Sequence, residues 1–203
     1  MVTLRDRAIA RLSQNPLTVD LGGGEPFQKY LGRYRRLFEG RKLLSVDLAA
    51  SRRPSIVGDI YRLPFATASL DGVICASVLE HLLEPGDAAI EIGRALKPGG
   101  HAFVYVPFLF PDHAASDYGD YFRFTAGGLR HLFRDFSTIE IEARDDYVGA
   151  TLRFITGFKV ESETIDRGLR PLKPVLDALA ILVKGSPLGR GRQTTGFDAF
   201  LTR

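Results

Sequence analysis

The sequence has very little cysteine and no tryptophan: among 203 residues, Cys75 is the only thiol. A single cysteine cannot close an internal disulfide, and it cannot supply the several thiolates of a cysteine-based zinc site. Cys75 lies in the apolar run 73–76, which predicts a small buried side chain rather than a reactive one. We therefore predict no metal site from the sequence.

Long hydrophobic runs are also missing. The longest apolar stretch, residues 175–183, is interrupted by Asp177 and is about half of what a membrane-spanning helix needs. Residues 1–15 alternate charged and apolar side chains and lack the continuous apolar core of a signal peptide. These absences predict a cytoplasmic protein.

Charge of one sign is scarce as well, because the net charge is only +3. Such a small excess does not predict a partner among nucleic acids. The composition, 45% hydrophobic and 25% charged residues, is that of an ordinary globular protein. A length of 203 residues favours one domain with a well-buried core.

What the sequence does contain is a regular alternation of strand and helix patterns. After an amphipathic helix at 3–13, we predict five strands and two intervening helices, with a tight turn at 97–100. The strands are 17–21, 42–47, 55–59, 70–76 and 102–106, and the helices are 26–38 and 85–96. This order predicts an α/β fold with a Rossmann-like, doubly wound and mostly parallel sheet.

Beyond residue 106 the pattern changes. We predict a long loop at 107–124, a helix capped by Thr125 that reaches Phe133, and strands at 138–142 and 196–202. The last strand is expected to be antiparallel and to complete a seven-stranded sheet. The chain then reads as one domain, with a lead-in helix (1–16), a cofactor-binding core (17–135) and C-terminal strands (136–203) that carry a helical insertion at 151–185.

Four acidic residues lie at or near predicted strand ends: Asp20, Asp47, Asp59 and Glu80. In open α/β sheets, ligands bind at the carboxyl ends of the strands. Asp47 follows Gly22 by 25 residues, close to the offset of an acid that binds ribose hydroxyls. Three consecutive glycines, 22–24, let backbone N–H groups approach a ligand closely. The pattern predicts an adenosine-type cofactor.

The glycine loop differs from two common nucleotide loops. A dinucleotide fingerprint would need glycine where Phe27 stands, and no Gly-Lys-Ser/Thr follows, as a phosphate loop would require. Glu25 beside the glycines disfavours a pyrophosphate and is compatible with a positively charged ligand. The loop therefore favours a cationic adenosine derivative over NAD or ATP.

Several motifs together resemble the class I S-adenosylmethionine-dependent methyltransferases. Residues 19–24 resemble the family's D-x-G-x-G motif, and 58–65 its adenine-side motif. Residues 69–82 resemble the motif at strand four, and 96–101 the turn before strand five. Tyr-Phe-Arg-Phe-Thr at 121–125 is similar to a subgroup of small methyltransferases of the domain-11 type.

This resemblance implies S-adenosyl-L-methionine as the cofactor. It places the glycine loop under the methionine and ribose, Asp47 on the ribose hydroxyls, and Asp59 with the Ile60 backbone at the adenine amine. The cofactor-binding residues that it implies are Asp20, Gly22, Gly23, Gly24, Asp47, Leu48, Asp59, Ile60, Ala76 and Ser77.

Candidates for catalysis and substrate binding lie mainly in the loop after strand five. His113 is favoured over His81 for contact with the substrate, and each is also open to an ordinary structural role. Tyr118, Tyr121 and Arg123 are candidates for binding the substrate. Arg123 could bind an anionic group or tie the loop to Asp117 or Asp120.

The function that we predict is methyl transfer to an O or N atom of a small molecule, such as a sugar or lipid intermediate. The alternative is a non-catalytic, methyltransferase-like module that binds and regulates. A nucleic-acid methyltransferase and a dehydrogenase are disfavoured by the missing base-amine motif, the low charge and the glycine spacing. The apolar helix expected at 174–183 could cover the sheet or a lipophilic substrate, and the segment 171–185 could form a peripheral membrane or dimer contact.

Overall fold

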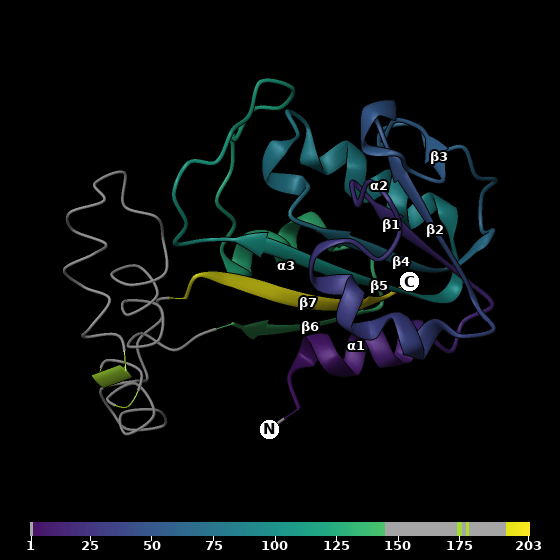
Figure 1. Cartoon of the computed structure of the whole chain (residues 1–203), viewed down its shortest axis with the longest axis horizontal. Helices are drawn as coiled ribbons and strands as arrows, with labels where there is room; N and C mark the ends of the chain where they lie inside the picture. Colours follow the sequence, from purple (N-terminus) through teal and green to yellow (C-terminus); the bar gives the residue numbers. More distant parts are fainter. Residues whose placement is uncertain (1, 145–173, 176–177, 179–193) are drawn as a thin grey trace.

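Seven strands form a single sheet in the order β3-β2-β1-β4-β5-β7-β6 (Figure 1). The computed structural model describes residues 2–144, 174–175, 178 and 194–203. Strands β1 to β5 are mutually parallel, and β7 runs antiparallel between β5 and β6. Their bounds are β1 Leu17–Leu21, β2 Lys42–Asp47, β3 Ile56–Val57, β4 Leu70–Ala76, β5 Leu96–Pro107, β6 Thr138–Ala143 and β7 Gly196–Thr202. The predicted doubly wound fold is confirmed.

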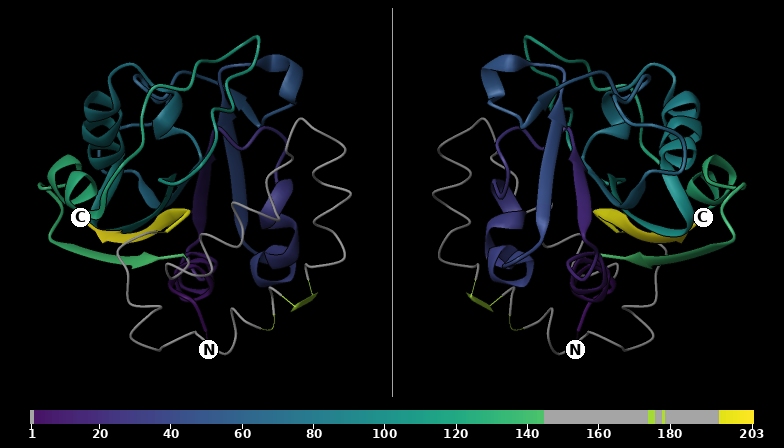
Figure 2. Two further views of the ribbon diagram at one scale, coloured as in Figure 1. Left: turned by 90° about the vertical axis from the view of Figure 1, so that its left-hand side faces the viewer. Right: turned by 90° about the vertical axis from the view of Figure 1, so that its right-hand side faces the viewer.

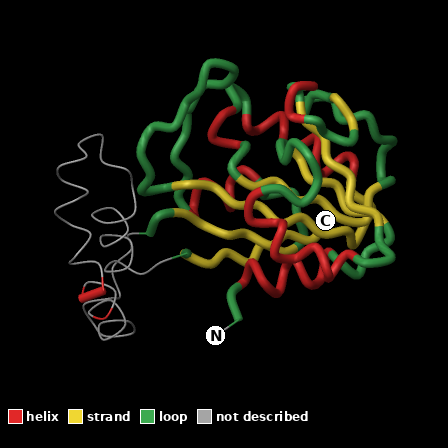
Figure 3. The backbone as a smooth tube through the Cα atoms, viewed as in Figure 1, coloured by secondary structure: helices red, strands yellow, loops and turns green. Residues whose placement is uncertain are grey.

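Helices cover both faces of the sheet (Figures 2 and 3). One face carries α1 (Leu4–Leu12) and the 3-10 helix η1 (Lys29–Phe38), and the other carries α2 (Pro85–Ala95) and α3 (Ala126–Leu132). Alternation along β4 explains the two layers: Ile74 faces the α1 side, whereas Val73 and Cys75 face the α2 side. All three side chains are fully buried.

Local sequence sets the helix starts. Thr3 accepts a hydrogen bond from the Asp6 N–H at 3.2 Å, and Asp6 accepts one from the Thr3 N–H, so the pair forms a capping box on α1. Thr125 caps α3 by accepting from the Gly128 N–H at 3.0 Å, as predicted. Pro85 opens α2 at a position where its missing N–H costs nothing.

Three predicted elements differ from the structure. The helix expected at 26–38 begins only at Lys29 and is a 3-10 helix, because Phe27 has a positive φ of 64° that no helix accommodates. The third strand is limited to two residues. The turn expected at 97–100 is a bulge within β5, where the pairing with β4 shifts between Leu70 and Gly72.

The predicted helical insertion at 151–185 lies almost entirely outside the described residues. The helix expected at 174–183 and the membrane or dimer contact through 171–185 therefore stay predictions. Within residues 2–144 and 194–203, together with the two short fragments between them, no helix is long and apolar enough to cross a membrane.

A buried ion pair joins α1 to the centre of the antiparallel strands. The Arg5 Nη2 atom lies 2.5 Å from the Asp198 Oδ1 atom, and both side chains are less than a tenth exposed. The Arg5 guanidinium also lies over the rings of Tyr30 and Tyr105, at 5.0 and 4.9 Å from their centroids. This contact fixes the first helix against the last strand.

We predict that Asp198→Ala destabilises the protein by about 3–5 kcal/mol, because it leaves the Arg5 charge buried without its partner. The free energy of unfolding in urea measures the effect. Arg7→Ala is the control, since its pair with Glu140 is more than half exposed and should cost at most about 1 kcal/mol. Equal losses for the two variants would contradict the prediction.

Candidate active site

The direction in which the chain adds strands reverses at β1. From β1 the chain continues outward to β2 and β3, and then returns to place β4 on the other side of β1. The carboxyl ends of β1 and β4 therefore form the switch point at which open α/β sheets bind ligands. Asp20 lies near the end of β1 and the glycine loop follows that strand, whereas Ala76 ends β4 and Ser77 comes directly after it. The structure brings these predicted residues to one edge.

The glycine loop is packed closely on both sides. Gly22 has a φ of +69° and donates its N–H to the Val46 carbonyl at 2.8 Å. A Cβ atom on Gly22 would lie 2.5 Å from the Val78 side chain, and one on Gly23 would lie 1.9 Å from the Asp20 carboxylate. Only glycine fits these two positions, so the backbone itself forms this part of the site.

Asp47 ends β2 with a carboxylate that retains hydrogen-bonding capacity. Asp47 is 5% exposed, and its Oδ1 atom accepts a hydrogen bond from the Ala49 N–H at 3.0 Å. The buried Oδ2 atom makes no hydrogen bond to any described residue, and the nearest cation, the Arg52 Nη1 atom, is 3.7 Å away. An acceptor of this kind fits the hydroxyl donors of a ribose.

The predicted adenine-side segment is held from α2. The Asp59 side chain accepts from the Tyr61 N–H at 2.9 Å. Glu91 accepts from the Leu63 N–H at 2.8 Å, and Arg94 Nη2 donates to the Phe65 carbonyl at 2.9 Å. Asp59 and Leu48 are exposed and Ile60 is half-buried, so these predicted contacts lie at the rim of the site.

Ser77 leaves β4 in an unusual conformation. Its φ is 56°, and its N–H donates to the Tyr105 carbonyl at 3.0 Å. A positive φ is uncommon in a residue other than glycine, and such strain is concentrated at functional sites. The backbone then turns directly into the short 3-10 helix η3 (Leu79–His81).

The loop at 108–125 is fastened to both sides of the switch point (Figure 1). On the β4 side, the N–H groups of Tyr121 and Phe122 donate to the Glu80 carbonyl at 2.8 and 3.2 Å. On the β2 side, the Arg52 Nη2 atom lies 2.5 Å from Asp117 Oδ2. Arg52 is the last residue of the short 3-10 helix η2 (Ala50–Arg52), and its Nη1 atom lies near Asp47, so it links the loop to Asp47.

Arg123 is engaged within this loop. Its Nη1 and Nη2 atoms form a two-pronged pair with Asp120 at 2.5 and 2.6 Å, and it also donates to the carbonyls of Phe110 and Pro111. Arg123 holds the pKa of Asp120 far below its usual value. Of the roles predicted for Arg123, the loop-tying one is seen, with Asp120 as its partner, whereas Asp117 pairs with Arg52.

His81 and His113 come together, with ring centroids 4.8 Å apart. The His81 Nδ1 atom lies 2.6 Å from the Gly119 carbonyl, and the His113 Nδ1 atom lies 2.9 Å from Asp120 Oδ2. Their Nε2 atoms lie 3.8 and 3.7 Å from the same oxygen, Oε1 of the fully buried Glu80. Burial lowers the pKa of His81, so its neutral form is favoured.

Two further predicted residues lie on this side. The Tyr118 ring is half-buried, with its centroid 4.5 Å from that of His81 and 5.1 Å from the Arg52 guanidinium carbon. Tyr121 is half exposed, at 52%. The two histidines, the buried glutamate and Tyr118 thus form one polar and aromatic wall between η3 and the loop.

The sequence did not reveal every residue that builds this site. Arg52 belongs to a basic pair that has the appearance of a solvated loop, and its partner Asp117 is 65 residues away. Tyr30 has a buried hydroxyl that makes no hydrogen bond to a described residue, and burial together with the Asp20 charge raises its pKa. No local pattern marks either residue.

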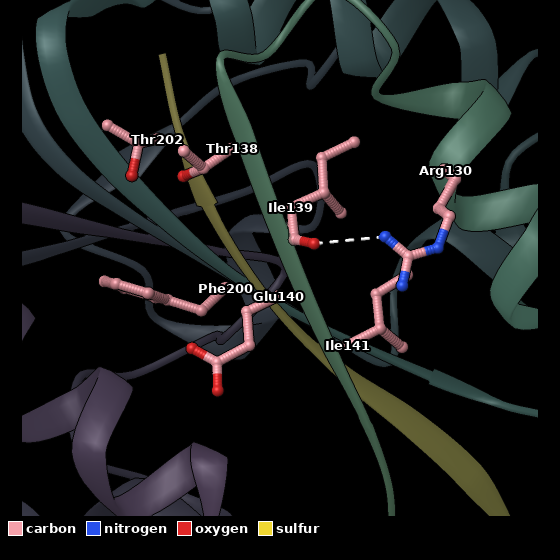
Figure 4. A pocket seen from close by; sticks show the side chains of 7 residues that line it. All are labelled: Arg130, Thr138, Ile139, Glu140, Ile141, Phe200 and Thr202. Carbon is pink, nitrogen blue, oxygen red and sulfur yellow. Dashed lines mark hydrogen bonds between the residues drawn. The ribbon is translucent and has the colours of Figure 1, made fainter.

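A separate hollow lies at the β6 edge of the sheet (Figure 4). It is lined by Arg130, Thr138, Ile139, Glu140, Ile141, Phe200 and Thr202. Arg130 crosses it to donate to the Ile139 carbonyl at 3.1 Å. None of the predicted site residues lines this hollow, and the position is far in the strand order from the switch point, so it is not the candidate site.

A protein-family model described as a methyltransferase domain matches residues 22–104, from the glycine loop into β5. No curated protein gives a match. Over residues 22–104 the chain is thus similar to the family that its motifs indicate, whereas the predicted bounds of the domain stay a prediction.

Solved structures share the fold at low identity. An S-adenosylmethionine-dependent methyltransferase of Archaeoglobus fulgidus is 14% identical over 98% of this chain and 94% of its own, with a TM-score of 0.57. Phosphoethanolamine N-methyltransferase 2 of Haemonchus contortus is 16% identical over 93% of this chain and 48% of its own, with a TM-score of 0.55. The 1,6-didemethyltoxoflavin-N1-methyltransferase of Burkholderia thailandensis is 18% identical over 98% of this chain and 80% of its own, with a TM-score of 0.54.

The contacts by which Glu91 and Arg94 of α2 hold the adenine-side segment should weaken in acid. Arg94 lowers the pKa of Glu91, so the charged carboxylate stabilises the fold above its ordinary pKa, and this contribution is lost as the pH falls through the lowered value. We predict that Glu91→Gln costs about 1.5–3 kcal/mol at pH 7. The difference from wild type should shrink below about pH 4.

Urea unfolding of both proteins at pH 7 and at acid pH measures this change. Glu39→Gln is the matched control, because Glu39 is exposed. A Glu91→Gln penalty that stays constant across the pH range would contradict the role of the charge.

Proposed function

We propose that this chain, which is a class I S-adenosylmethionine-dependent methyltransferase, methylates an oxygen or nitrogen atom of a small molecule, such as a sugar or lipid intermediate. The observation that carries the proposal is the arrangement at the switch point. A glycine loop and the Asp47 Oδ2 atom, which makes no hydrogen bond to a described residue, lie on the cofactor side, and two histidine Nε2 atoms lie beyond β4 on the other.

S-adenosylmethionine is the cofactor, and it supplies a methyl group already activated by the sulfonium. We propose that Asp47 accepts hydrogen bonds from both ribose hydroxyls and that Gly22 to Gly24 lie under the ribose and methionine. Asp59 and the Ile60 backbone face the adenine, while Ala76 and Ser77 line the opposite side. The absence of side chains at Gly22 and Gly23, where a Cβ atom would lie 2.5 Å from Val78 and 1.9 Å from the Asp20 carboxylate, supports a ligand held against backbone.

Because the methyl group is already activated, alignment of the acceptor supplies much of the rate. Correct positioning of reacting groups can contribute about 7–11 kcal/mol. We propose that the wall of Tyr118, Glu80 and the two histidines, together with the neighbouring Tyr121, receives the acceptor. Arg123 acts on this wall through Asp120, which it fixes beside His113.

An acceptor that starts protonated must lose a proton during transfer. The Nδ1 atom of each histidine faces an oxygen acceptor, which favours the tautomer with the proton on Nδ1 and a lone pair on Nε2. We propose that His113 Nε2, with His81 Nε2 beside it, accepts the proton. His113 is favoured over His81 because its side chain is the more exposed, at 29% against 13%.

A small acceptor is supported by charge and by the similar structures. A net charge of +3 provides little attraction for a nucleic acid. By their titles, two of the similar proteins are N-methyltransferases named for small molecules. Fold likeness does not decide the substrate, so a direct test is required. The cytoplasm remains the proposed compartment, because Cys75 has no partner for an internal disulfide.

We predict that Asp47→Ala weakens the binding of S-adenosylmethionine by about 10- to 100-fold, because hydrogen bonds to a charged group are lost. Titration calorimetry with S-adenosylmethionine and its demethylated product measures the change, and Asp135→Ala, at an exposed acid, is the control. NAD should not bind. Binding of NAD in place of the sulfonium compound would overturn the assignment of the cofactor.

We predict that small hydroxyl- and amine-bearing acceptors, but not RNA or DNA, release demethylated cofactor when incubated with the enzyme. With an acceptor so found, His113→Ala should lower kcat by at least about 100-fold while leaving cofactor affinity unchanged. His131→Ala, at an exposed histidine of α3, controls for loss of an imidazole. Methyl transfer to nucleic acid alone would refute the proposed substrate class.

A further inference from the structure

Three donor atoms meet where η3 faces the loop at 108–125. They are one ring nitrogen each of His81 and His113 and a carboxylate oxygen of Glu80, and they lie within 4.8 Å of one another. The Nε2 atoms of both rings face Glu80 Oε1. We propose that these atoms bind a divalent transition-metal ion such as Zn²⁺, Fe²⁺ or Co²⁺. Nitrogen and carboxylate ligands in this combination suit such ions, and three protein ligands leave a position open.

The outer contacts of both histidines favour metal binding. A metal-ligating histidine donates its other ring N–H to a carboxylate or a backbone carbonyl, which fixes its orientation. His113 has such a carboxylate in Asp120, 2.9 Å from its Nδ1, and His81 has the Gly119 carbonyl at 2.6 Å. Both rings are therefore held with Nε2 toward the same oxygen of Glu80.

The spacing is close to that of a coordinated set. Ligand atoms at ~2.1 Å around a tetrahedral ion lie about 3.4 Å from one another. The two nitrogen-to-oxygen distances here are 3.8 and 3.7 Å. Small side-chain movements would close the difference. His113 comes from the loop after β5, whereas Glu80 and His81 are adjacent in η3, so the ion would join two segments.

The local charge also favours a cation. Glu80 is 0% exposed, and its carboxylate faces two imidazoles whose Nδ1 protons point elsewhere. The negative charge of Asp120 is matched by its pair with Arg123. A carboxylate and two imidazoles brought together in this way are ligands suited to a cation.

The location links the site to the proposed reaction. In placing an acceptor beside these residues, this step rests on the proposed function, whereas metal binding itself does not. An ion at the two Nε2 atoms would take the place of the base, because a hydroxyl that binds a divalent ion loses its proton more easily, and the proton would pass to solvent water. The acceptor oxygen would then occupy the open position.

Metal binding is tested on the full chain after removal of bound ions with a chelator. We expect about one equivalent of Zn²⁺ by calorimetry, and Co²⁺ should give visible absorption bands typical of a site with fewer than six ligands. Glu80→Gln and His113→Ala should each weaken binding by at least tenfold, whereas Asp120→Asn should weaken it by about 10- to 100-fold with all three ligands retained.

The chain provides matched controls, because its other two histidines, His101 and His131, lie elsewhere in the described structure. His131→Ala and Glu84→Gln should bind Zn²⁺ as the wild type does. Circular dichroism checks that each variant is folded, and His113→Ala, in the loop, is the variant that tests the site if Glu80→Gln fails to fold.

Failure to bind Zn²⁺ or Co²⁺ in the wild type, or equal binding by wild type and His113→Ala, would overturn the metal site. Calorimetry with S-adenosylmethionine on the same metal-free protein separates this result from the proposed function. Cofactor binding without metal binding would reject only the ion, and metal binding without cofactor binding would reject only the methyltransferase site.

Discussion

At the end of β1 the backbone must turn within three residues while it lies against two side chains. The Asp20 side chain leaves no room for a Cβ atom at position 23, and the Val78 side chain leaves little room for one at position 22. The Gly22 N–H is in turn fixed to the Val46 carbonyl of β2. This close packing places a bare backbone at the switch point, next to the buried Asp47 carboxylate. In the proposed function, the binding of the cofactor and the position of the acceptor both depend on this turn.

The second half of the site is built by contacts between distant segments. The Glu80 carbonyl receives two N–H groups of the loop, and Arg52 joins the same loop to β2. Within the loop, Arg123 fixes Asp120, and Asp120 orients His113 toward Glu80. A chain of ionic contacts thus sets the direction of one imidazole. Whether the imidazole binds a proton or an ion, its geometry comes from this chain of contacts.

The fold was predictable from the sequence because its signals are local. The periodicity of strands 17–21, 42–47 and 70–76, the capping residues Thr3 and Thr125, and the glycines at 22–24 each act over a few residues. The start of η1 was not predictable, because it depends on the positive φ of Phe27. The bulge in β5 likewise depends on how that strand pairs with β4.

The candidate site was predictable only in part, for the same physical reason. Asp47 and the glycine loop stand at fixed offsets along the chain, so sequence spacing finds them. The meeting of His81 with His113, and of Arg52 with Asp117, depends on the path of an irregular loop. Side chains that the sequence presents as separate candidates, or as solvated charges, become one cluster only when that loop is folded.

The central claim is that the cofactor lies across the carboxyl ends of β1 and β4. Backbone amide chemical shifts, recorded by NMR on the labelled protein during titration with the demethylated cofactor, test it most directly. The account predicts the largest changes at Gly22 to Gly24, Asp47 and Ser77, and none around the hollow at Arg130 and Ile139. Changes centred on that hollow, with the glycine amides unmoved, would contradict it.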